Sequence, residues 1–191
     1  AFNRNGEVVG HYYKKHLPPS ELFTVKLDST YTREFSEPYV LEIDGIRYGF
    51  LTCYDFYFYE AFANIGRYNP EVIIACAYQR SDSHDAIETM CRFLAYNTNA
   101  YVLRSSVSMD VNSDIGGGSM VVSPKGDVLL NMKSRVGIET VEIDPKKKYY
   151  KPAGYGNPEI AHFEYIEHGR RPWKYRPAGS AIMLPDHLAP Y

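Results

Sequence analysis

The chain has 191 residues, of which 45% are hydrophobic, and its 21 Lys and Arg against 23 Asp and Glu give a formal net charge of -2. This length supports one hydrophobic core and one domain, and no run of 18 apolar residues predicts a membrane span. The balanced charge excludes a whole-chain attraction to nucleic acid or to an anionic membrane, so the expected partners are small molecules or proteins.

The opening residues predict a hairpin turn. Asn-Arg-Asn-Gly at residues 3–6 is a turn sequence that feeds a strand through Val8 and Val9. Because such a hairpin lacks its first strand, we expect residues to be absent upstream. The same opening has neither the basic nor the apolar region of a secretory signal.

Loops and a second hairpin are predicted up to residue 52. Pro18, Pro19 and the polar and aromatic residues that follow, to Pro38, favour a loop with short strands. Asp44-Gly45 interrupts an alternating apolar pattern, and this dipeptide favours a two-residue hairpin turn. We therefore expect strand, turn and strand, ending near Thr52.

Two helix and strand pairs are predicted next. Residues 56–65 have helical spacing, and residues 71–77 (EVIIACA) are typical of a strand buried on both faces. Ser83 is a predicted N-cap, and the apolar residues from 86 to 94 recur at helical spacing. Strand character resumes at residues 101–103.

The last predicted elements are strands and a tail. Residues 120–123 and 128–131 flank a Pro-Lys-Gly-Asp turn, and residues 139–143 alternate like a further strand. Residues 149–191 are rich in Pro, Gly, Arg and Tyr, which predicts an extended tail with a short helix around residues 160–168. The tail is a candidate arm for contact with another subunit, and residues 1–148 form the predicted domain.

The order of elements favours sheets covered by helices, an α/β or layered α+β class, over a helical bundle. Cys53 lies where a predicted apolar strand ends and a helical segment begins. A free cysteine is most often a small buried hydrophobe, but the end of a strand exposes the side chain beside backbone N–H groups, which favours the reactive thiolate. Cys53 is therefore the candidate nucleophile.

Four sequence motifs resemble those of one superfamily. Residues 51–60 (LTCYDFYFYE) resemble the nucleophile motif of the nitrilase, or carbon–nitrogen hydrolase, superfamily. Residues 6–17 (GEVVGHYYKKHL) resemble its lysine motif and put the catalytic lysine at Lys14, with Lys15 as second choice. Residues 117–129 resemble its late hairpin and residues 91–102 its helix-into-strand segment, so the likeness covers roughly residues 4–145.

This resemblance implies an α/β fold, the four-layer α-β-β-α sandwich of the nitrilase type, apparently lacking its N-terminal part and often doubled by dimerisation. It implies that Cys53 attacks the substrate, that Lys14 stabilises the charged intermediate and that Glu21 helps to orient the lysine or a proton path. The family's general-base glutamate belongs to a motif upstream of the lysine, and no residue of this chain matches it.

The predicted reaction is hydrolysis of an amide or N-carbamoyl bond through a cysteine thioester, because Tyr54 follows the cysteine where true nitrilases typically carry tryptophan. By resemblance, Tyr54 lends its backbone N–H to the oxyanion, and Tyr78 and Gln79 bind the substrate. Two alternatives stay open: acyl transfer to an amine through the same thioester, and a non-catalytic scaffold that lacks the base.

Other polar residues are expected to be structural. Asp55 and Glu60 follow the nucleophile closely, and we expect them to favour a helix dipole or to pair with Arg92. The three cysteines and six histidines show neither metal-ligand nor disulfide spacing, and the run of glycines at residues 116–118 matches no phosphate loop. We therefore expect no metal, no cofactor and a cytoplasmic location, and the resemblance implies a homodimer or larger homo-oligomer.

Overall fold

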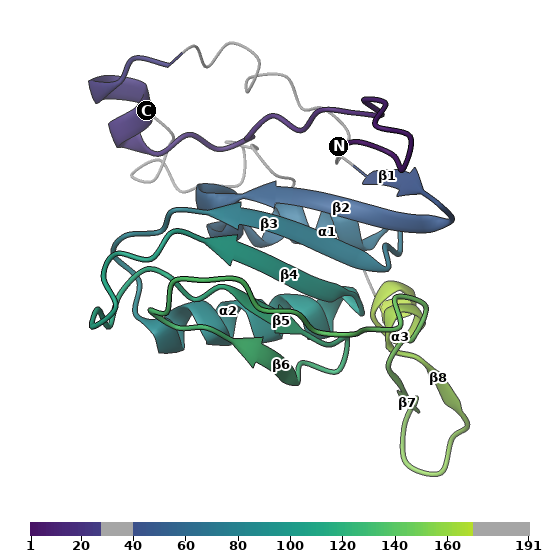
Figure 1. The fold of residues 1–191 in the computed structure, drawn as a ribbon. Coiled ribbons are helices and arrows are strands. Elements are labelled where there is room, and N and C mark those ends of the chain that lie inside the picture. Colours follow the sequence, from purple (N-terminus) through teal and green to yellow (C-terminus); the bar gives the residue numbers. More distant parts are fainter. Residues whose placement is uncertain (28–39, 170–191) are drawn as a thin grey trace, which may run out of the picture.

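The structure, a computed structural model, describes residues 1–27 and 40–169, and these residues are organised by one large sheet (Figure 1). The sheet consists of β1 (Val40–Ile43), β2 (Ile46–Thr52), β3 (Val72–Ala77), β4 (Tyr101–Ser106), β5 (Met120–Val122) and β6 (Val128–Asn131). The strands lie side by side in chain order. β2, β3 and β4 are parallel, whereas β1, β5 and β6 are antiparallel to their neighbours.

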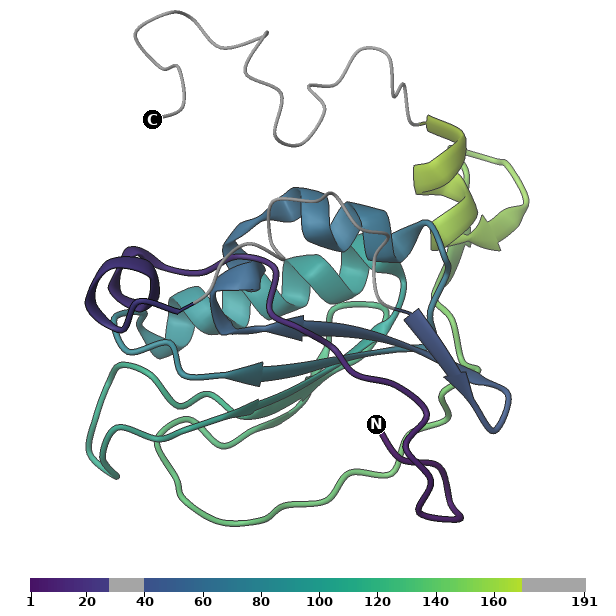
Figure 2. The same cartoon turned by 90° about the horizontal axis from the view of Figure 1, so that it is seen from above.

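Two helices connect the parallel strands and cover the same face of the sheet (Figure 2). α1 (Tyr59–Gly66) follows a 3₁₀ turn at Cys53–Tyr57, and α2 (His84–Thr98) begins at the predicted N-cap, where the Ser83 hydroxyl accepts a hydrogen bond from Ala86 N. Within the described part of the chain, no helix has the length and apolar character needed to cross a bilayer.

The hydrophobic core lies between these helices and the sheet. Its fully buried side chains come from α1, α2 and every second residue of the central strands: Leu51, Phe62, Ile65, Ile73, Ala75, Ile87, Cys91, Leu94, Val102, Met120 and Val122. At Gly49 of β2, a Cβ atom would lie 2.5 Å from Ile65 Cγ2. Only glycine therefore allows α1 to pack this closely on the sheet.

The opposite face of the sheet is apolar but less buried. The residues that alternate with the core positions include Phe50, Ile74 and Leu103, which are partly exposed, and Cys76, which is exposed. An amphipathic sheet stabilises a domain by burying one face, so the described residues supply two layers, helices and sheet. This is the mixed α/β class that was predicted, with helices over one face of a central sheet.

Most predicted elements are confirmed, including the Asp44-Gly45 hairpin, in which both residues have positive φ (53° and 74°) as a type I′ turn requires. The opening turn closes differently from the prediction. Phe2 pairs with Val8, and Val9 N donates to Ala1 O, so residues 1–2 lie against residues 8–9 on the two sides of the turn.

The prediction of a strand at residues 139–143 is wrong. No strand or helix forms between residues 132 and 148, and this segment runs along the side of the sheet away from the helices (Figure 2). Its alternation is visible in the exposure of the side chains, since Val141 and Ile143 are partly exposed and Glu142 between them is exposed. A strand needs a partner for its backbone groups as well as a pattern, and no described strand lies against this segment.

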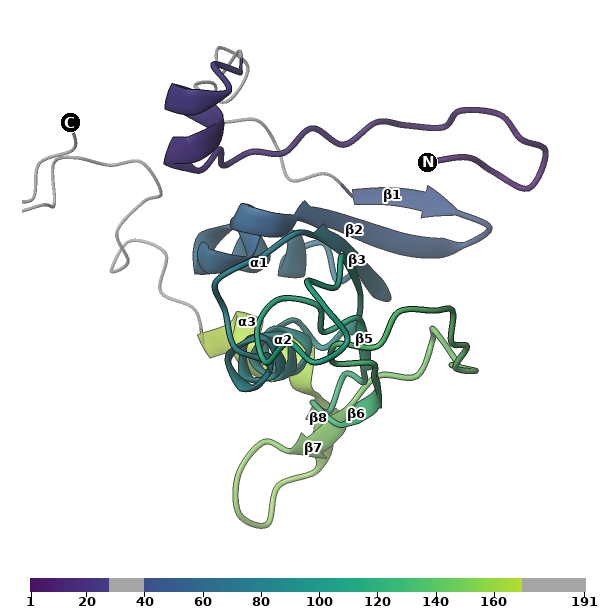
Figure 3. The same cartoon turned by 60° about the vertical axis from the view of Figure 1, so that its left-hand side comes forward.

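The described part of the predicted tail is folded. β7 (Tyr150–Pro152) and β8 (Glu159–Ala161) form a hairpin, and α3 (His162–Gly169) packs against α2 (Figure 3). Asn99 holds this arm to the body, since its side chain accepts from Tyr149 N (2.9 Å) and donates to Tyr149 O (3.3 Å). Contact of the arm with another subunit stays a prediction, and residues 170–191 lie outside the described residues.

Glu71, which directly precedes β3, connects three separate segments of the chain. Its carboxylate accepts hydrogen bonds from Arg47 N (2.6 Å) and Arg47 Nη2 (3.0 Å), and Lys146 Nζ lies 3.3 Å away. Burial alone raises the pKa of Glu71, but the bonds from Arg47 and Lys146 outweigh it and lower the pKa from 4.5 to about 2. One buried carboxylate thus joins β2 and β3 to residue 146.

We predict that Glu71→Gln lowers the free energy of unfolding at pH 7 by about 2 kcal/mol, since the bonds to Arg47 lose their charge assistance. A carboxyl whose pKa is lowered by folding contributes stability above its unfolded pKa, and this contribution is lost as pH falls toward 2. The deficit of the variant should therefore shrink as pH falls from about 5.

Urea unfolding across pH measures both effects. Glu139→Gln is the matched control, because Glu139 pairs with Arg135 at the surface, where both side chains are exposed. An equal loss in both variants, or a deficit for Glu71→Gln that does not change between pH 7 and pH 3, would contradict this role of Glu71.

Candidate active site

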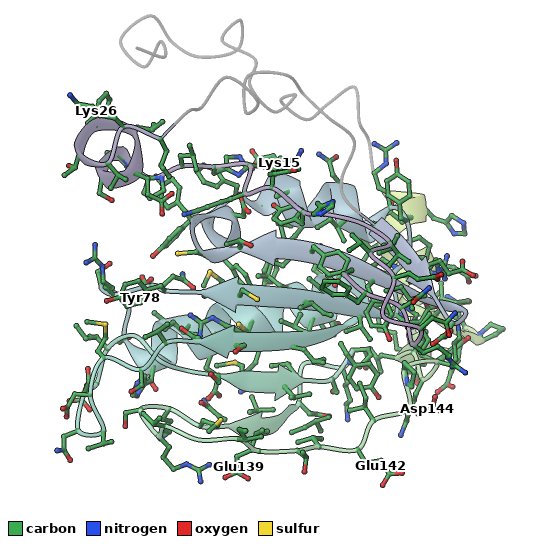
Figure 4. All side chains as sticks on the ribbon, turned by 45° about the horizontal axis from the view of Figure 1, so that its top comes forward. Lys15, Lys26, Tyr78, Glu139, Glu142 and Asp144 are labelled. Atoms are coloured by element: carbon green, nitrogen blue, oxygen red, sulfur yellow. The ribbon has the colours of Figure 1, made fainter. Side chains whose placement is uncertain are left out.

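The candidate site lies at the carboxyl ends of β2, β3 and β4. Parallel strands end at the same edge of a sheet, and the loops that follow them there form the usual binding edge of an α/β fold. Tyr78 projects just beyond β3 at this edge (Figure 4), and the helical turn at Ser20–Thr24 lies at the same end (Figure 1). The first segment of the chain thereby reaches the residues that follow the strands.

Cys53 has an unusual backbone conformation. Cys53 follows Thr52, which is extended (φ -137°), and has a φ of +52° itself. This angle lies in the left-handed region, which residues other than glycine rarely adopt. The chain turns sharply here from β2 into the 3₁₀ turn, and the Cys53 side chain is partly exposed. Strain of this kind gathers at functional sites, where the surrounding contacts impose it.

Asp55 clamps this turn to the first segment of the chain. Its side chain is fully buried, and each of its two oxygens accepts two contacts. Oδ2 accepts from Tyr12 Oη (2.6 Å) and Thr52 N (3.0 Å), whereas Oδ1 lies 2.8 Å from both His16 N and His16 Nδ1. The residues on both sides of Lys14 are therefore fixed to a carboxylate two positions after Cys53.

The charge of Asp55 is stabilised where it is buried. Burial by itself raises the pKa of this carboxyl, but the hydrogen bonds from His16, Tyr12 and Thr52 together hold the pKa below its usual value. The expected role of Asp55 was structural, and its partners are His16 and Tyr12. The predicted pairing with Arg92 is wrong, because Arg92 contacts Glu88 and Gly126 O instead.

Lys14 is held by Glu21. Lys14 Nζ lies 2.7 Å from both carboxylate oxygens of Glu21, which is in the helical turn Ser20–Thr24. The Lys14 side chain is only 14% exposed and that of Glu21 30%. The structure thus brings together two of the predicted catalytic residues. The Lys14 ammonium is held by Glu21, and most of the Lys14 side chain is shielded from water.

Aromatic rings surround the turn that carries Cys53. The His16 ring stacks on Phe58 at 3.8 Å between centroids, and Tyr54 contacts Phe58 (5.2 Å) and Tyr57 (5.5 Å). Ring pairs in such geometry stabilise beyond the area they bury. The ring of Tyr54 therefore supports the turn, while the proposed use of its backbone N–H stays a prediction.

The two residues predicted to bind substrate differ in environment. Tyr78 is 47% exposed, with Arg80 over its ring at 5.3 Å. Gln79 is 4% exposed and is used inside the protein, where Oε1 accepts from Arg104 and Nε2 donates to Asp82. An exposed Tyr78 can meet a ligand, whereas Gln79 is committed to buried partners.

A further polar cluster near Cys53 was not predicted from the sequence. Arg104 of β4 is 3% exposed and donates to Gly117 O and Gly118 O. Gly116, Gly117 and Gly118 all have positive φ, and their N–H groups bond to Asp82 O, Val107 O and Lys133 O. These glycines therefore join three loops, and their N–H groups are not free to bind a phosphate. Alternation along β4 was the available signal, because it places Arg104 on the buried face.

No group of three or more potential metal-ligating side chains occurs within residues 1–27 and 40–169. The described ionisable groups at this edge include those of an acid–base or nucleophilic site: a thiol, an ammonium paired with a carboxylate, and a buried carboxylate that joins the segments carrying them. Such a set can attack an electrophilic carbon and stabilise the charge that develops on it.

Comparison with known proteins adds a family. A family model described as carbon-nitrogen hydrolase matches residues 1–148. Two hydrolases from strains of Mycobacterium tuberculosis are each 27% identical over 147 residues, covering 70% of this chain and 51% of their own length. A hydrolase in the agr operon of Staphylococcus aureus is 25% identical over 145 residues, covering 75% of this chain and 54% of its own. The chain therefore spans about half the length of these relatives.

Solved structures share the fold. Nit3 of Saccharomyces cerevisiae, a member of the nitrilase superfamily, matches 70% of this chain and 47% of its own with a TM-score of 0.57 and 19% identity. An amidase from Nesterenkonia sp., in complex with butyramide, matches 71% of this chain and 51% of its own with a TM-score of 0.58 and 19% identity. At this identity the likeness concerns the fold, and it supports the predicted nitrilase-type class over the matched part.

We predict that Asp55→Asn loosens the lysine segment and lowers the free energy of unfolding by about 2–4 kcal/mol. One asparagine amide cannot accept all four contacts, so at least one donor of Tyr12, His16 or Thr52 is left unpaired. Hydrogen exchange of the amides at residues 12–16 should become faster in the variant, as measured by mass spectrometry.

Asp127→Asn serves as its control, because Asp127 lies exposed in the turn between β5 and β6. Unchanged exchange at residues 12–16 in Asp55→Asn would mean that the lysine segment is held by other contacts.

Proposed function

The chain belongs to the carbon–nitrogen hydrolase family, and we propose that it hydrolyses a non-peptide carbon–nitrogen bond, of the amide or N-carbamoyl type, with Cys53 as nucleophile. The observation that carries the proposal is the Asp55 clamp. It joins the turn of Cys53 to the segment of Lys14, two regions separated along the chain that match the family's nucleophile and lysine motifs.

The first half of the proposed reaction forms a thioester. The Cys53 thiolate attacks the carbonyl carbon, the C–S bond forms and the carbonyl electron pair moves to oxygen. The Lys14 ammonium and a backbone N–H, assigned to Tyr54, stabilise this oxyanion. Collapse of the tetrahedral intermediate breaks the C–N bond, and the leaving nitrogen takes a proton to depart as ammonia or amine.

Water completes the cycle in the second half. It attacks the thioester carbon, loses a proton to a general base and releases the acid and the free thiol. Glu21 contacts Lys14 through both carboxylate oxygens, so its role in the proposal is to hold the lysine in place. We assign the general base of this step to no residue of this chain.

A short aliphatic amide is the first substrate to test. Support for an amide comes from Tyr54 after the nucleophile and from the nitrilase-superfamily amidase that shares this fold and binds butyramide. An ammonium fixed by Glu21, in the segment that Asp55 joins to the turn of Cys53, suits a reaction in which negative charge develops on the oxygen of a neutral substrate.

We predict that Cys53→Ala lowers the release of ammonia from butyramide by at least about a thousandfold in the protein expressed from its natural gene, because no other described group replaces the thiolate. Ammonia release under saturating substrate measures the effect. Cys76→Ala is the matched control: Cys76 is the exposed thiol of β3, and its loss should leave the rate unchanged.

Three results separate the alternatives. Ammonia release that survives Cys53→Ala would contradict the proposed nucleophile. Release that yields an amide of an added amine in place of the acid would assign acyl transfer. A wild-type protein that releases no ammonia from amides or N-carbamoyl compounds would favour a scaffold.

A further inference from the structure

Arg104 is a buried cation at the candidate site. It lies on β4 with 3% of its surface exposed, and its guanidinium donates to Gly117 O, Gly118 O and Gln79 Oε1, the last at 2.9 Å. No ion pair links it to a carboxylate within the described residues. Burying an arginine without an ion pair is costly, so its placement calls for a reason beyond packing.

Arg104 lies within electrostatic range of Cys53. Burial lowers the pKa of Arg104, and the negative forms of Cys91, Cys53, Asp82 and Tyr57 act in the opposite direction. Three of these four groups, all but Cys91, belong to the turn after β2 or to the loop after β3.

Arg104 fixes the orientation of the Gln79 side chain. A guanidinium has donors only, so the amide oxygen of Gln79 must face it. The amide nitrogen then points to the other side, where it donates to Asp82 Oδ2 at 3.2 Å. Because Gln79 is itself 4% exposed, its amide cannot turn around without leaving a buried donor facing another donor.

Asp82 connects the Gln79 side chain to the 3₁₀ turn that begins at Cys53. The same oxygen, Oδ2, accepts the hydroxyl of Tyr57, and the backbone carbonyl of Asp82 accepts Gly116 N at 2.9 Å. Asp82 is thus anchored by its main chain, and its side chain is left to hold Tyr57. Tyr57 is the last residue of the 3₁₀ turn that begins at Cys53, and its ring packs on Tyr54.

We propose that Arg104, Gln79 and Asp82 are positioning residues that hold the Tyr57 ring beside Cys53, where this ring limits the bulk of the acyl group that reaches the thiol. Tyr57 is 48% exposed, so a large part of its ring is available to a ligand. Its hydroxyl is committed to Asp82, and the ring therefore acts as an apolar wall. The preferred substrates have a short, unbranched acyl group.

This inference rests on the proposed role of Cys53, but its test needs no turnover. Iodoacetamide and its N-benzyl derivative both alkylate thiols, and they differ in bulk. The ratio of their rates at Cys53, followed by peptide mass spectrometry, reports the space beside the thiol. A change that only loosens the fold or alters thiol reactivity affects both rates alike, whereas movement of a wall changes the ratio.

Two variants release the ring without removing it. Tyr57→Phe keeps the ring and deletes the hydroxyl that Asp82 accepts. Gln79→Glu keeps the shape and the bond to Arg104, but turns the donor toward Asp82 into an acceptor. We predict that each variant lowers the preference for the smaller reagent by at least about threefold, because losing a hydrogen bond to a charged group shifts an equilibrium by about tenfold or more and part of that shift reaches the rate ratio. The double variant should lower it no further than the stronger single variant.

Ser105→Ala is the control, since Ser105 is the exposed neighbour of Arg104 on the other face of β4, and its ratio should equal that of the wild type. Should Gln79→Glu not fold by thermal melting, Tyr57→Phe decides alone, because it removes one atom from a half-exposed ring. A wild-type ratio in Tyr57→Phe, or effects of the two variants that multiply, would overturn the proposal. A wild-type Cys53 that reacts no faster than Cys76 would instead contradict the proposed function, and the ratios would still test the network.

Discussion

The arrangement of the candidate site depends on one buried carboxylate. Asp55 receives its contacts from Tyr12, His16 and Thr52, so the first segment of the chain and the turn after β2 share a single acceptor. A buried charge is tolerated only when its hydrogen bonds are complete, and this makes both segments necessary to each other. The position of the Lys14 segment relative to the turn of Cys53 is therefore a consequence of how hydrogen bonds stabilise the charge of Asp55.

The scaffold makes such a clamp possible. Three parallel strands bring the loops after residues 52, 77 and 106 to one edge, and α1 and α2 hold these strands from one side only. Around this edge, positive φ angles occur at Cys53, where they strain the backbone, and at the run of three glycines, where they do not and where Arg104 holds two of the carbonyls. The rigid sheet supplies the contacts that impose these conformations, which is how strain persists in a stable fold.

Much of the fold could be predicted from sequence because its signals are local. The Asp44-Gly45 turn, the Ser83 cap and the apolar run of β3 each indicate their own structure within a few residues. The prediction of a strand at residues 139–143 was wrong because a strand depends on a partner strand, which no local pattern reveals. Lys14, Glu21 and Cys53 were predicted through motifs, whereas the contacts of Asp55 with Tyr12, His16 and Thr52 required the folded chain.

The polar cluster around Arg104 lay beyond the reach of sequence. Its members come from four separate segments, and each residue type is ordinary on a surface, so neither spacing nor composition marks Gln79, Asp82 or Tyr57 as a group. Alternation in β4 buries Arg104, but it does not indicate which acceptors compensate for the lost water. Long-range hydrogen bonds between loops are decided by the sheet that brings the loops together.

The most direct test of this account is to trap the acyl-enzyme. The protein expressed from its natural gene is mixed with butyramide, quenched in acid within one turnover and digested for mass spectrometry. The account predicts a butyryl mass on the peptide that contains Cys53, absent from the peptides of Cys76 and Cys91. Hydrolysis of the amide with Cys53 unmodified at every quench time, or an acyl group on another residue, would contradict it.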